Sequence, residues 1–449
     1  MALRIGAGQG FVLDDPRGMR EVIDDGVDYL CCEALAEFTL TAMFHERQQD
    51  SNAGYARDVA AVAEMALPAV AGGTRLITNA GGLNAVGARQ AVGEVARRLG
   101  IGGMRVGMVL GADQTGRLPG LAAATGGLCH ADTGERLESL DDVDFAAAYL
   151  GAFPIVDALE QGADVVITER VADTSVFMAP AIHELGVARD DWERLGRLAI
   201  MGHLLECSAQ VSGGNFSGRW WEVPDLDRVG FPIAEIDDRA EAVITKPRGS
   251  GGLVSPDTVK EQLLYEVGDP SRYLTPDVVA DMTSPTLIDA GPDRVLVSGA
   301  RGSPATDTYK VILSRRAGWC AAVGVTFTYP AALAKAQCAK EILDRRLKSA
   351  GIAPLETWVE YIGAGGSWGE SGSEDAEEVV LRYVVRCASA EEASAILIER
   401  LRALSASGPP GAAASGMGTT VPTPMCAIWP TLVPKELIDP YVRVLVEDL

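Results

Sequence analysis

The first part of the chain alternates between short apolar runs and longer segments in which apolar residues recur every three to four positions. A short apolar run is typical of a buried strand, and the longer spacing is typical of a helix that packs on one face. This alternation predicts a parallel sheet whose strands are joined by right-handed crossovers. The predicted strands are 3–6, 27–35, 75–79, 104–110 and 163–168, and the predicted helices are 19–23, 55–67, 86–99, 145–161, 178–185, 192–210 and 258–265.

The pattern changes near residue 289, where short alternating strands with hairpin-like spacers begin. Such strands predict antiparallel pairing. We therefore expect an α/β domain over residues 1–285, a mainly parallel sheet with flanking helices, followed by a smaller α+β domain over 286–449. The predicted later strands are 294–298, 309–314, 320–328, 358–362 and 379–386, with helices at 331–347 and 391–404. Helix ends or loops are predicted at 41–53, 115–144, 365–375 and 405–420.

Charge and hydropathy narrow the class of protein. The chain has 449 residues and a formal net charge of −23, whereas binding to nucleic acid or to an anionic membrane needs clustered Lys and Arg. We therefore expect neither partner. No run of about 18 apolar residues is present, so no membrane span is expected. The sequence opens directly into a strand-like run without a signal-peptide pattern, and we expect a cytoplasmic protein.

The cysteines give no sign of a metal site or of a disulfide framework. Eight are scattered along the chain without a CxxC pair. Reduced thiols in a cytosolic protein are the simplest interpretation. The cysteines occupy positions 31, 32, 129, 207, 320, 338, 387 and 426.

Glycine-rich loops follow the first and third predicted strands. The first reads Gly6-Ala-Gly-Gln-Gly10 and matches a dinucleotide fingerprint only loosely, because its third glycine comes too early. The second, at 79–84, precedes a helix whose N-terminus favours anions. A tight strand-to-helix turn needs the same glycines, so both interpretations stay open. The predicted substrate contacts in these loops are Gly8, Gly10, Asn79, Gly81 and Gly82.

Charged side chains follow the ends of two predicted parallel strands. Glu33 ends the second strand, and Glu169 and Arg170 follow the strand at 163–168. In an open α/β sheet the carboxyl ends of the strands face the ligand crevice. Asp173 and Thr174 also suit a plain N-cap of the next helix. We predict catalytic roles for Glu33 and Glu169, and substrate contacts from Arg170, Asp173 and Thr174.

The stretch GHLLECSAQVSGGNF, residues 202–216, is dense in groups capable of chemistry. If the helix that precedes it continues, His203, Glu206, Cys207 and Gln210 recur at three- and four-residue steps and share one face. A helix packed in the core would have the same spacing, with Cys207 as a small hydrophobic residue. We predict catalytic roles for His203, Glu206 and Cys207. The Gly-Gly turn adds Gly213, Gly214 and Asn215 as predicted substrate contacts.

The segment KPRGSGGL at 246–253 is basic and rich in glycine, and a helix begins just after it. Cationic side chains, free amides and a helix N-terminus together suit a phosphate or a carboxylate. A surface loop would have the same composition. We predict that Lys246 and Arg248 contact an anionic part of the substrate.

Several of these stretches together resemble the N-terminal domain of the acyclic terpene utilisation (AtuA) family. The resemblance covers nearly the whole chain. It implies a fold and a substrate among branched isoprenoid acids or their acyl-CoA thioesters, but no particular reaction. Many relatives carry a further small C-terminal domain, which this sequence is not expected to include. The stretches are RIGAGQGF (4–11), CEALAEFTL (32–40), ITNAGGLN (77–84), GADVVITERVADTS (162–175), GHLLECSAQVSGGNF (202–216) and KPRGSGGLVSPDTVKEQLLYEVGDPSRYLTPDVVADM (246–282).

The first functional hypothesis is an enzyme of lyase or hydratase type. Its substrate would be an acyl thioester, bound to CoA or to a carrier protein, or a related branched carboxylate. Such chemistry needs a general acid and base and an oxyanion site. The glycine loops offer backbone amides, and Lys246 and Arg248 can hold CoA phosphates. The acid–base candidates are Glu33, Glu169, His203 and Glu206.

Two other functions stay open. Cys207 with His203 as its base would give a hydrolase or an acyl transferase, and the chain could also be a non-catalytic binding or assembly protein. His203 and Glu206 supply only two metal ligands, which do not define a site, so neither a metal nor a cofactor is predicted. We expect a homo-oligomer. If helix 192–210 crosses the strand-end edge, the side chains Glu33, Glu169, Arg170, His203 and Cys207 should line one pocket.

Overall fold

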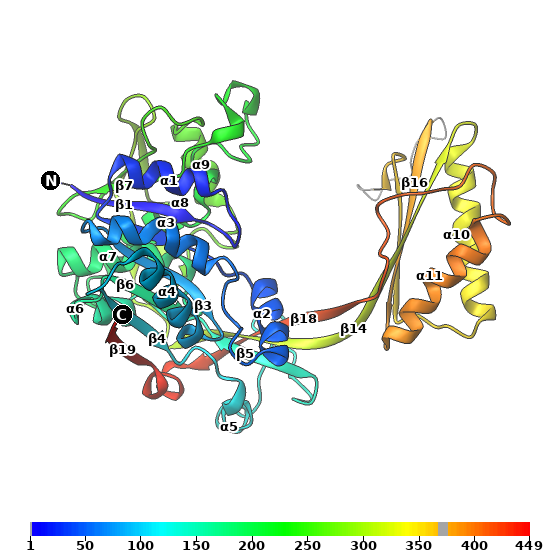
Figure 1. Cartoon of the computed structure of the whole chain (residues 1–449), viewed down its shortest axis with the longest axis horizontal. Coiled ribbons are helices and arrows are strands. Elements are labelled where there is room, and N and C mark those ends of the chain that lie inside the picture. Colours follow the sequence, from blue (N-terminus) through cyan, green and yellow to red (C-terminus); the bar gives the residue numbers. More distant parts are fainter. Residues whose placement is uncertain (1, 367–375) are drawn as a thin grey trace. The chain divides into compact units, whose positions relative to one another are not determined.

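The computed structural model describes residues 2–366 and 376–449, which form two compact units (Figure 1). The first unit contains the residues up to Leu313 together with Trp429–Leu449. The second contains Ser314–Ile428. The second unit is thus an insertion in the sequence of the first, whereas the sequence pattern had suggested two consecutive domains divided at residue 285.

The first unit is built on a ten-stranded mixed sheet. Its strands, in pairing order, are β11 (Thr286–Asp289), β12 (Val295–Ser298), β8 (Ala242–Thr245), β7 (Ile233–Ile236), β1 (Leu3–Gln9), β2 (Tyr29–Cys32), β3 (Arg75–Gly82), β6 (Val165–Glu169), β4 (Arg105–Leu110) and β19 (Arg443–Asp448). The five strands from β1 to β4 in this order pair in parallel. The others pair antiparallel. The predicted α/β fold with a mainly parallel sheet is confirmed as a mixed sheet with a parallel core.

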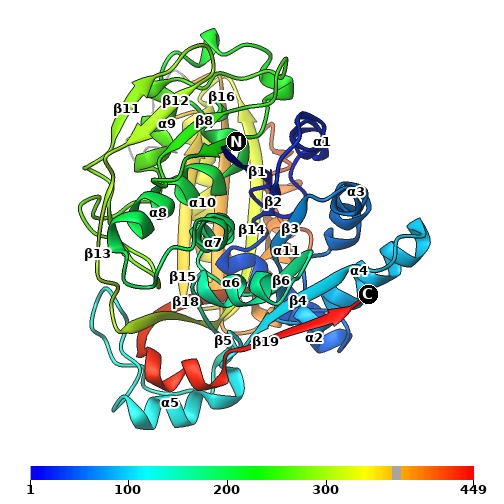
Figure 2. The same cartoon turned by 90° about the vertical axis from the view of Figure 1, so that its left-hand side faces the viewer.

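Helices cover both faces of this sheet. The helices of the first unit are α1 (Pro16–Asp25), α2 (Glu37–Gln49), α3 (Val59–Ala71), α4 (Ala85–Leu99), α5 (Leu118–Ala124), α6 (Phe153–Glu160), α7 (Asp173–Leu185), α8 (Trp192–Glu206) and α9 (Pro256–Leu264). Figure 2 shows α1, α3 and α4 on one side of the sheet and α6, α7 and α8 on the other. The central strands β3 and β6 are buried along nearly their whole length, as expected for a sheet covered on both faces.

Local sequence explains where these helices begin and end. The Asp15 side chain accepts a hydrogen bond from the Arg17 amide, and Pro16 occupies the first turn of α1, where its missing N–H costs nothing. Asn84 caps α4 in the same way, and α4 ends at Gly100 in the left-handed conformation. These caps place the carboxyl ends of β1 and β3 next to helix N-termini.

Three predicted elements differ from the structure. The segment expected as one helix at 145–161 begins as strand β5 (Val143–Ala148), and α6 starts only at Phe153, because the alanine-rich run pairs with a neighbouring strand. The segment 41–53, expected as a helix end and loop, belongs mostly to α2. The helix expected to run to residue 210 ends at Glu206 and is followed by a 3₁₀ turn, η2 (Ser208–Gln210).

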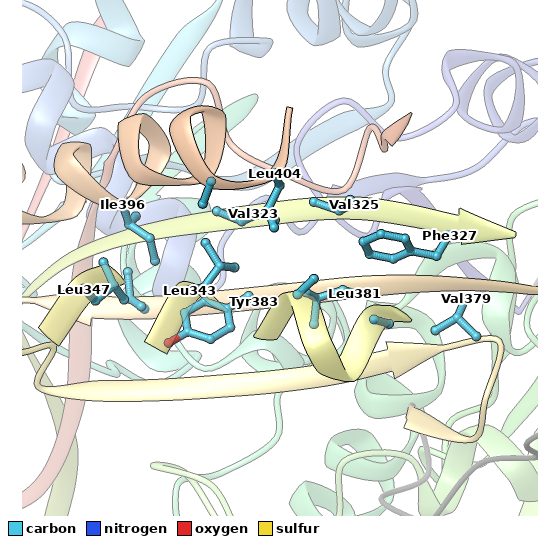
Figure 3. Packing of buried hydrophobic residues seen from close by; sticks show 14 of the residues in the cluster. Val323, Val325, Phe327, Leu343, Leu347, Val379, Leu381, Tyr383, Ile396 and Leu404 are labelled. Carbon is cyan, nitrogen blue, oxygen red and sulfur yellow. The ribbon is translucent and has the colours of Figure 1, made fainter. Parts of the chain in front are cut away.

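The second unit is an antiparallel sheet packed against two helices. β14 (Thr308–Thr328) is one long strand where the sequence pattern suggested two, and its later part pairs with β16 (Glu378–Cys387). β15 (Glu356–Ile362), β17 (Ala413–Ala414) and β18 (Thr423–Pro434) complete the pairing, and the helices are α10 (Ala332–Ser349) and α11 (Ala390–Leu404). Figure 3 shows the core between sheet and helices, whose buried residues include Phe327, Leu343, Leu381 and Ile396.

A third, small sheet lies in the first unit and consists of β9 (Tyr273–Leu274), β10 (Val279–Asp281) and β13 (Arg301–Ser303). The loop predicted at 365–375 falls, for residues 367–375, outside the described part of the chain. None of the helices in the described residues combines the length and the apolar character needed to cross a bilayer. All eight cysteines are free thiols.

Candidate functional site

A small cavity of about 250 Å³ lies at the carboxyl ends of β1, β2 and β6 in the first unit. Because parallel strands end at one edge of the sheet, residues far apart in sequence meet there. We call it the acidic cavity, after the five carboxyl groups that line it. They belong to Glu33, Glu37, Asp173, Glu206 and Glu266, and the other ionisable groups are Arg170, Lys310, Tyr149 and Cys207.

Glu33 stands directly after β2 and is held in a fixed position. Its Oε1 accepts hydrogen bonds from Asn79 Nδ2 at 2.8 Å and from the Leu35 amide at 2.8 Å. Asn79 Oδ1 in turn accepts from the Ala34 amide. Burial, and then the charge of Asp173, raise the pKa of Glu33 well above its usual value, against the opposing effect of Arg170. Glu33 is therefore a carboxyl group that favours its protonated form.

Arg170 follows β6 and is almost completely buried. Its Nη1 donates to Asp173 Oδ1 and to the Val171 carbonyl, and lies 3.8 Å from Glu33 Oε1. The guanidinium stacks on the Tyr149 ring, 4.0 Å from its centroid. Its Nε has no hydrogen-bond partner among the described residues. Arg170 thus places a positive charge between two carboxyl groups of the cavity.

A second cation also lies against the Tyr149 ring. Lys310 Nζ lies 4.6 Å from the Tyr149 centroid and 3.4 Å from Glu37 Oε1. The Tyr149 hydroxyl also donates to Glu37. Burial opposes ionisation of Glu37, but the hydrogen bond from Tyr149 and the charge of Lys310 lower its pKa to about 2. Glu37 is therefore ionised at neutral pH, whereas the pKa of Glu33 is moved in the opposite direction by burial.

His203 and Glu206 form a buried pair at the end of α8. His203 Nδ1 lies 2.7 Å from Glu206 Oε1, and Nε2 lies 2.9 Å from the Gln262 carbonyl oxygen. A carbonyl can only accept, so Nε2 carries a hydrogen. The remaining proton lies on Nδ1 or on Glu206, and the two groups share it. The Gln262 side chain donates back to the His203 carbonyl and fixes the ring.

Burial and the charges of the two groups set the pKa values that govern this shared proton. Burial raises the pKa of Glu206 to about 7, despite the lowering effect of His203. Burial would lower the pKa of His203, but the charge of Glu206 and its hydrogen bond raise it above the usual value. Glu206 Oε2 is buried without a hydrogen-bond partner among the described residues. Glu206 thus lines the cavity, and its Oε2 is free to accept a proton. His203 contacts its other oxygen and does not line the cavity.

Cys207 lines the cavity but is a poor nucleophile. Burial, and then the charges of Glu206 and Glu266, raise the pKa of its thiol. The base predicted for it, His203, has both ring nitrogens engaged by Glu206 and by the Gln262 carbonyl. The thiolate is therefore disfavoured at neutral pH.

The predicted glycines act mainly by allowing close approach of backbone. A Cβ on Gly10, which lines the cavity, would lie 2.9 Å from the backbone of Cys207 and Ser208. A Cβ on Gly81 would lie 2.5 Å from the Thr168 carbonyl oxygen. Gly10 therefore lets the end of β1 contact the end of α8. The glycines Gly8, Gly81, Gly82, Gly213 and Gly214 are not among the residues that line the acidic cavity.

Glu169 is not brought to the cavity. One of its oxygens, Oε2, accepts hydrogen bonds from three successive amides, those of Gly111, Ala112 and Asp113. Side chains alternate in direction along a strand, so Glu169 and Arg170 leave β6 on different sides. The hydrogen bonds of Glu169 fix the loop after β4 in place.

Other predicted contacts also lie elsewhere. Lys246 Nζ donates to the Ser250 carbonyl and pairs with Asp293 at 3.1 Å, and the Arg248 amide donates to Asp25. Thr174 is buried inside the first turn of α7. Asn215 donates to Gln210 at 3.4 Å. None of these four side chains is among those that line the acidic cavity.

Four ionisable residues that line the cavity were missed from the sequence. Tyr149 lies in a segment that the pattern assigned to a helix, Glu37 lies between two predicted elements, and Lys310 was assigned to the second domain. Glu266 follows α9 with a positive φ of 59°. Only Glu37 had a usable signal, since it follows the end of β2 by five residues within the CEALAEFTL stretch.

The donor set offers no arrangement for a metal. In residues 2–366 and 376–449, no three His, Cys, Asp or Glu side chains are grouped so that they could hold an ion. His203 and Glu206 therefore gain no third protein ligand there.

Comparison with known proteins places the chain in a family. Residues 3–444 match the family described as acyclic terpene utilisation family protein AtuA. No curated protein and no solved structure gave a significant match. The match spans both units and nearly the whole sequence, and it includes the strand ends and the helix that form the acidic cavity. The chain therefore belongs to the acyclic terpene utilisation (AtuA) family.

Proposed function

We propose that the protein is an enzyme of lyase or hydratase type that acts on an acyl thioester or a related branched carboxylate. One observation carries the proposal: two buried carboxyl groups with raised pKa values, Glu33 and Glu206, line the same small cavity. They come from the ends of β2 and α8. Paired carboxyl groups whose pKa values are moved toward neutrality suit general acid and base catalysis.

The roles follow from the environments. Removal of water from a 3-hydroxyacyl thioester takes a proton from the carbon next to the carbonyl and gives one to the leaving hydroxyl. Glu206, with a pKa of about 7, is the base: its free Oε2 takes the substrate proton, while its Oε1 keeps the hydrogen bond with His203. Glu33, held protonated, is the acid. Arg170, 3.8 Å from Glu33, supplies positive charge for the enolate oxygen.

The family supports the substrate class rather than the reaction. Its description names acyclic terpene utilisation, and the resemblance implies branched isoprenoid acids handled as thioesters. Among the described residues that line the acidic cavity, two are cations, Arg170 and Lys310, and each is paired with a carboxylate. It therefore suits the uncharged thioester end of a substrate better than a free carboxylate or a phosphate.

The thiol alternative is weaker. A hydrolase or acyl transferase through Cys207 needs a thiolate and a free base, whereas the pKa of Cys207 is raised and His203 is fully engaged. A binding or assembly protein would show the same cavity without turnover, so the experiment below separates it from an enzyme.

The test uses CoA thioesters of branched 2-enoic acids and of the matching 3-hydroxy acids. Loss or gain of the conjugated enoyl absorbance reports turnover, and exchange of the proton next to the carbonyl in D₂O reports the first step alone. We expect Glu33→Gln and Glu206→Gln each to lower kcat by roughly 100-fold or more. Glu64→Gln, an exposed change on α3, is the matched control and should retain full activity.

Two results would reject the proposal. Full activity in both cavity variants would remove the acid and base roles. Wild-type protein that binds these thioesters without turnover or exchange would favour the binding-protein alternative.

A further inference from the structure

A second cavity of about 550 Å³ adjoins the acidic cavity within the first unit. Tyr149 and Lys310 line both. Ala172 and Val267 line the second cavity, and their chain neighbours Asp173 and Glu266 line the acidic cavity. The two hollows therefore share a wall made by the Tyr149 ring and the Lys310 side chain.

The second cavity differs from the first in its lining. Charged groups line part of it, namely Asp132, Asp269, Arg272 and the shared Lys310, but none of the buried carboxyl groups with raised pKa values does. Leu274 and Leu432 are more than half exposed, at 56% and 51%. Large apolar side chains exposed on a concave wall gain free energy when an apolar group covers them. The apolar wall consists of Leu274, Pro276, Pro430 and Leu432.

The two cavities differ in volume, which suits them to different parts of a ligand. The acidic cavity, at about 250 Å³, lies below the range of roughly 300–1,000 Å³ typical of ligand pockets. It has room for the reacting end of an acyl group but not for a long chain as well. The second cavity lies within that range. A ligand with a polar end and an apolar chain fits the two together.

We infer that the second cavity binds the apolar branched chain of the acyl group whose thioester end occupies the acidic cavity. This inference rests on the proposed function and assigns a place to the part of the substrate that does not react. The Tyr149 ring, which contacts both Arg170 and Lys310, lies where the two cavities adjoin. Leu274 and Leu432 then determine which chain lengths are accepted.

Tyr273 connects the second cavity with the His203–Glu206 pair. Tyr273, which lines it, packs against the His203 ring with 5.3 Å between centroids. His203 shares its proton with Glu206 in the acidic cavity. A chain that fills the second cavity therefore contacts Tyr273, which packs on the ring that supports the base, so chain length should change kcat as well as KM.

The test measures binding without turnover. Pantetheine thioesters of saturated branched acids of increasing length cannot undergo hydration, and their Kd is measured by calorimetry. In wild-type protein the affinity should rise by about fourfold for each added methylene that enters the cavity. In Leu274→Trp and Leu432→Trp, which fill the space, the rise should stop at short chains. Leu226→Trp, an exposed change that does not line the cavity, is the matched control.

Several outcomes would overturn the inference. Affinity that does not depend on chain length in the wild type, or that still rises in both tryptophan variants, would remove the chain site. A change of oligomeric state in those variants, seen by light scattering, would make the exposed leucines a subunit interface instead. Leu432→Ala, which widens the cavity and should weaken binding of long chains, covers the case in which tryptophan prevents folding.

The two proposals fail separately. If enoyl thioesters are not turned over but saturated ones bind with the expected dependence on length, the reaction is wrong and the chain site stands. If turnover occurs but the Kd ignores chain length, the reaction stands and the chain site is wrong.

Discussion

Replacing Glu206 by glutamine should change how the stability of the protein depends on pH. In the folded chain the pKa of Glu206 rises from 4.5 to about 7, so the folded state binds a proton that the unfolded state has lost. Its contribution to stability is complete below pH 4.5 and disappears as the pH rises through about 7. At about 1.4 kcal/mol for each tenfold change in proton affinity, this corresponds to roughly 3 kcal/mol.

His203 adds to the same trend. Its pKa is also raised on folding, so its contribution is present below its ordinary value of 6.5 and is lost as the pH rises through the folded value. The pair should therefore make the wild type steadily less stable between about pH 5 and pH 8. Glutamine cannot ionise, and it can still donate a hydrogen bond to His203 Nδ1.

Urea unfolding at several pH values between about 5 and 8 measures this difference. The wild type should lose roughly 3 kcal/mol more than Glu206→Gln over that interval. Glu64→Gln, whose carboxyl is exposed and paired with Arg98, should follow the wild type. Other buried carboxyl groups cancel in the comparison because all three proteins contain them. Equal slopes for wild type and Glu206→Gln would refute the reasoning and remove Glu206 as a base active at neutral pH.

Three further outcomes follow from the geometry. Cys207→Ala should leave kcat with enoyl thioesters unchanged, and a large loss would return the thiol mechanism to first place. Glu169→Gln, which weakens a carboxylate bonded to three amides, should lower stability by about 1–3 kcal/mol in urea unfolding while kcat of the folded protein is retained. Titration of denatured protein without reductant should find most of the eight thiols free, and two or more disulfides in freshly purified protein would contradict this.

Strand ends were the most informative part of the sequence for locating the cavity. The rule that parallel strands end at a ligand crevice led to Glu33 and Arg170, and both line the acidic cavity. The same rule could not separate Arg170 from its neighbour Glu169, since the side-chain direction alternates and depends on where the strand ends. Tyr149 and Lys310 were out of reach because Tyr149 follows β5 and Lys310 lies on β14, and the pairing of these strands joins distant segments.

Periodicity likewise indicated the parallel core but not the additions to it. Crossover helices and apolar runs are local features, so β1 to β4 could be recognised along the chain. The pairing of β19 with β4 joins residues 443–448 to residues 105–110. No local pattern encodes such a partner, and the insertion of the second unit was missed for the same reason. Charged residues such as Lys246 looked like ligand contacts because their partner, Asp293, is also remote in sequence.

The insertion has a consequence for how the protein is made. During synthesis the chain emerges from its N-terminus, and β4 is complete long before its partner β19 exists. The second unit, Ser314–Ile428, lies wholly between them and can begin to fold first. Until residues 443–448 arrive, β4 presents an unpaired edge, the feature of a sheet most prone to aggregation. Leu432, in the wall of the second cavity, is delivered by the same returning segment. A ribosome that stalls after the second unit would thus release a chain with a structured insertion, an open sheet and an incomplete cavity wall.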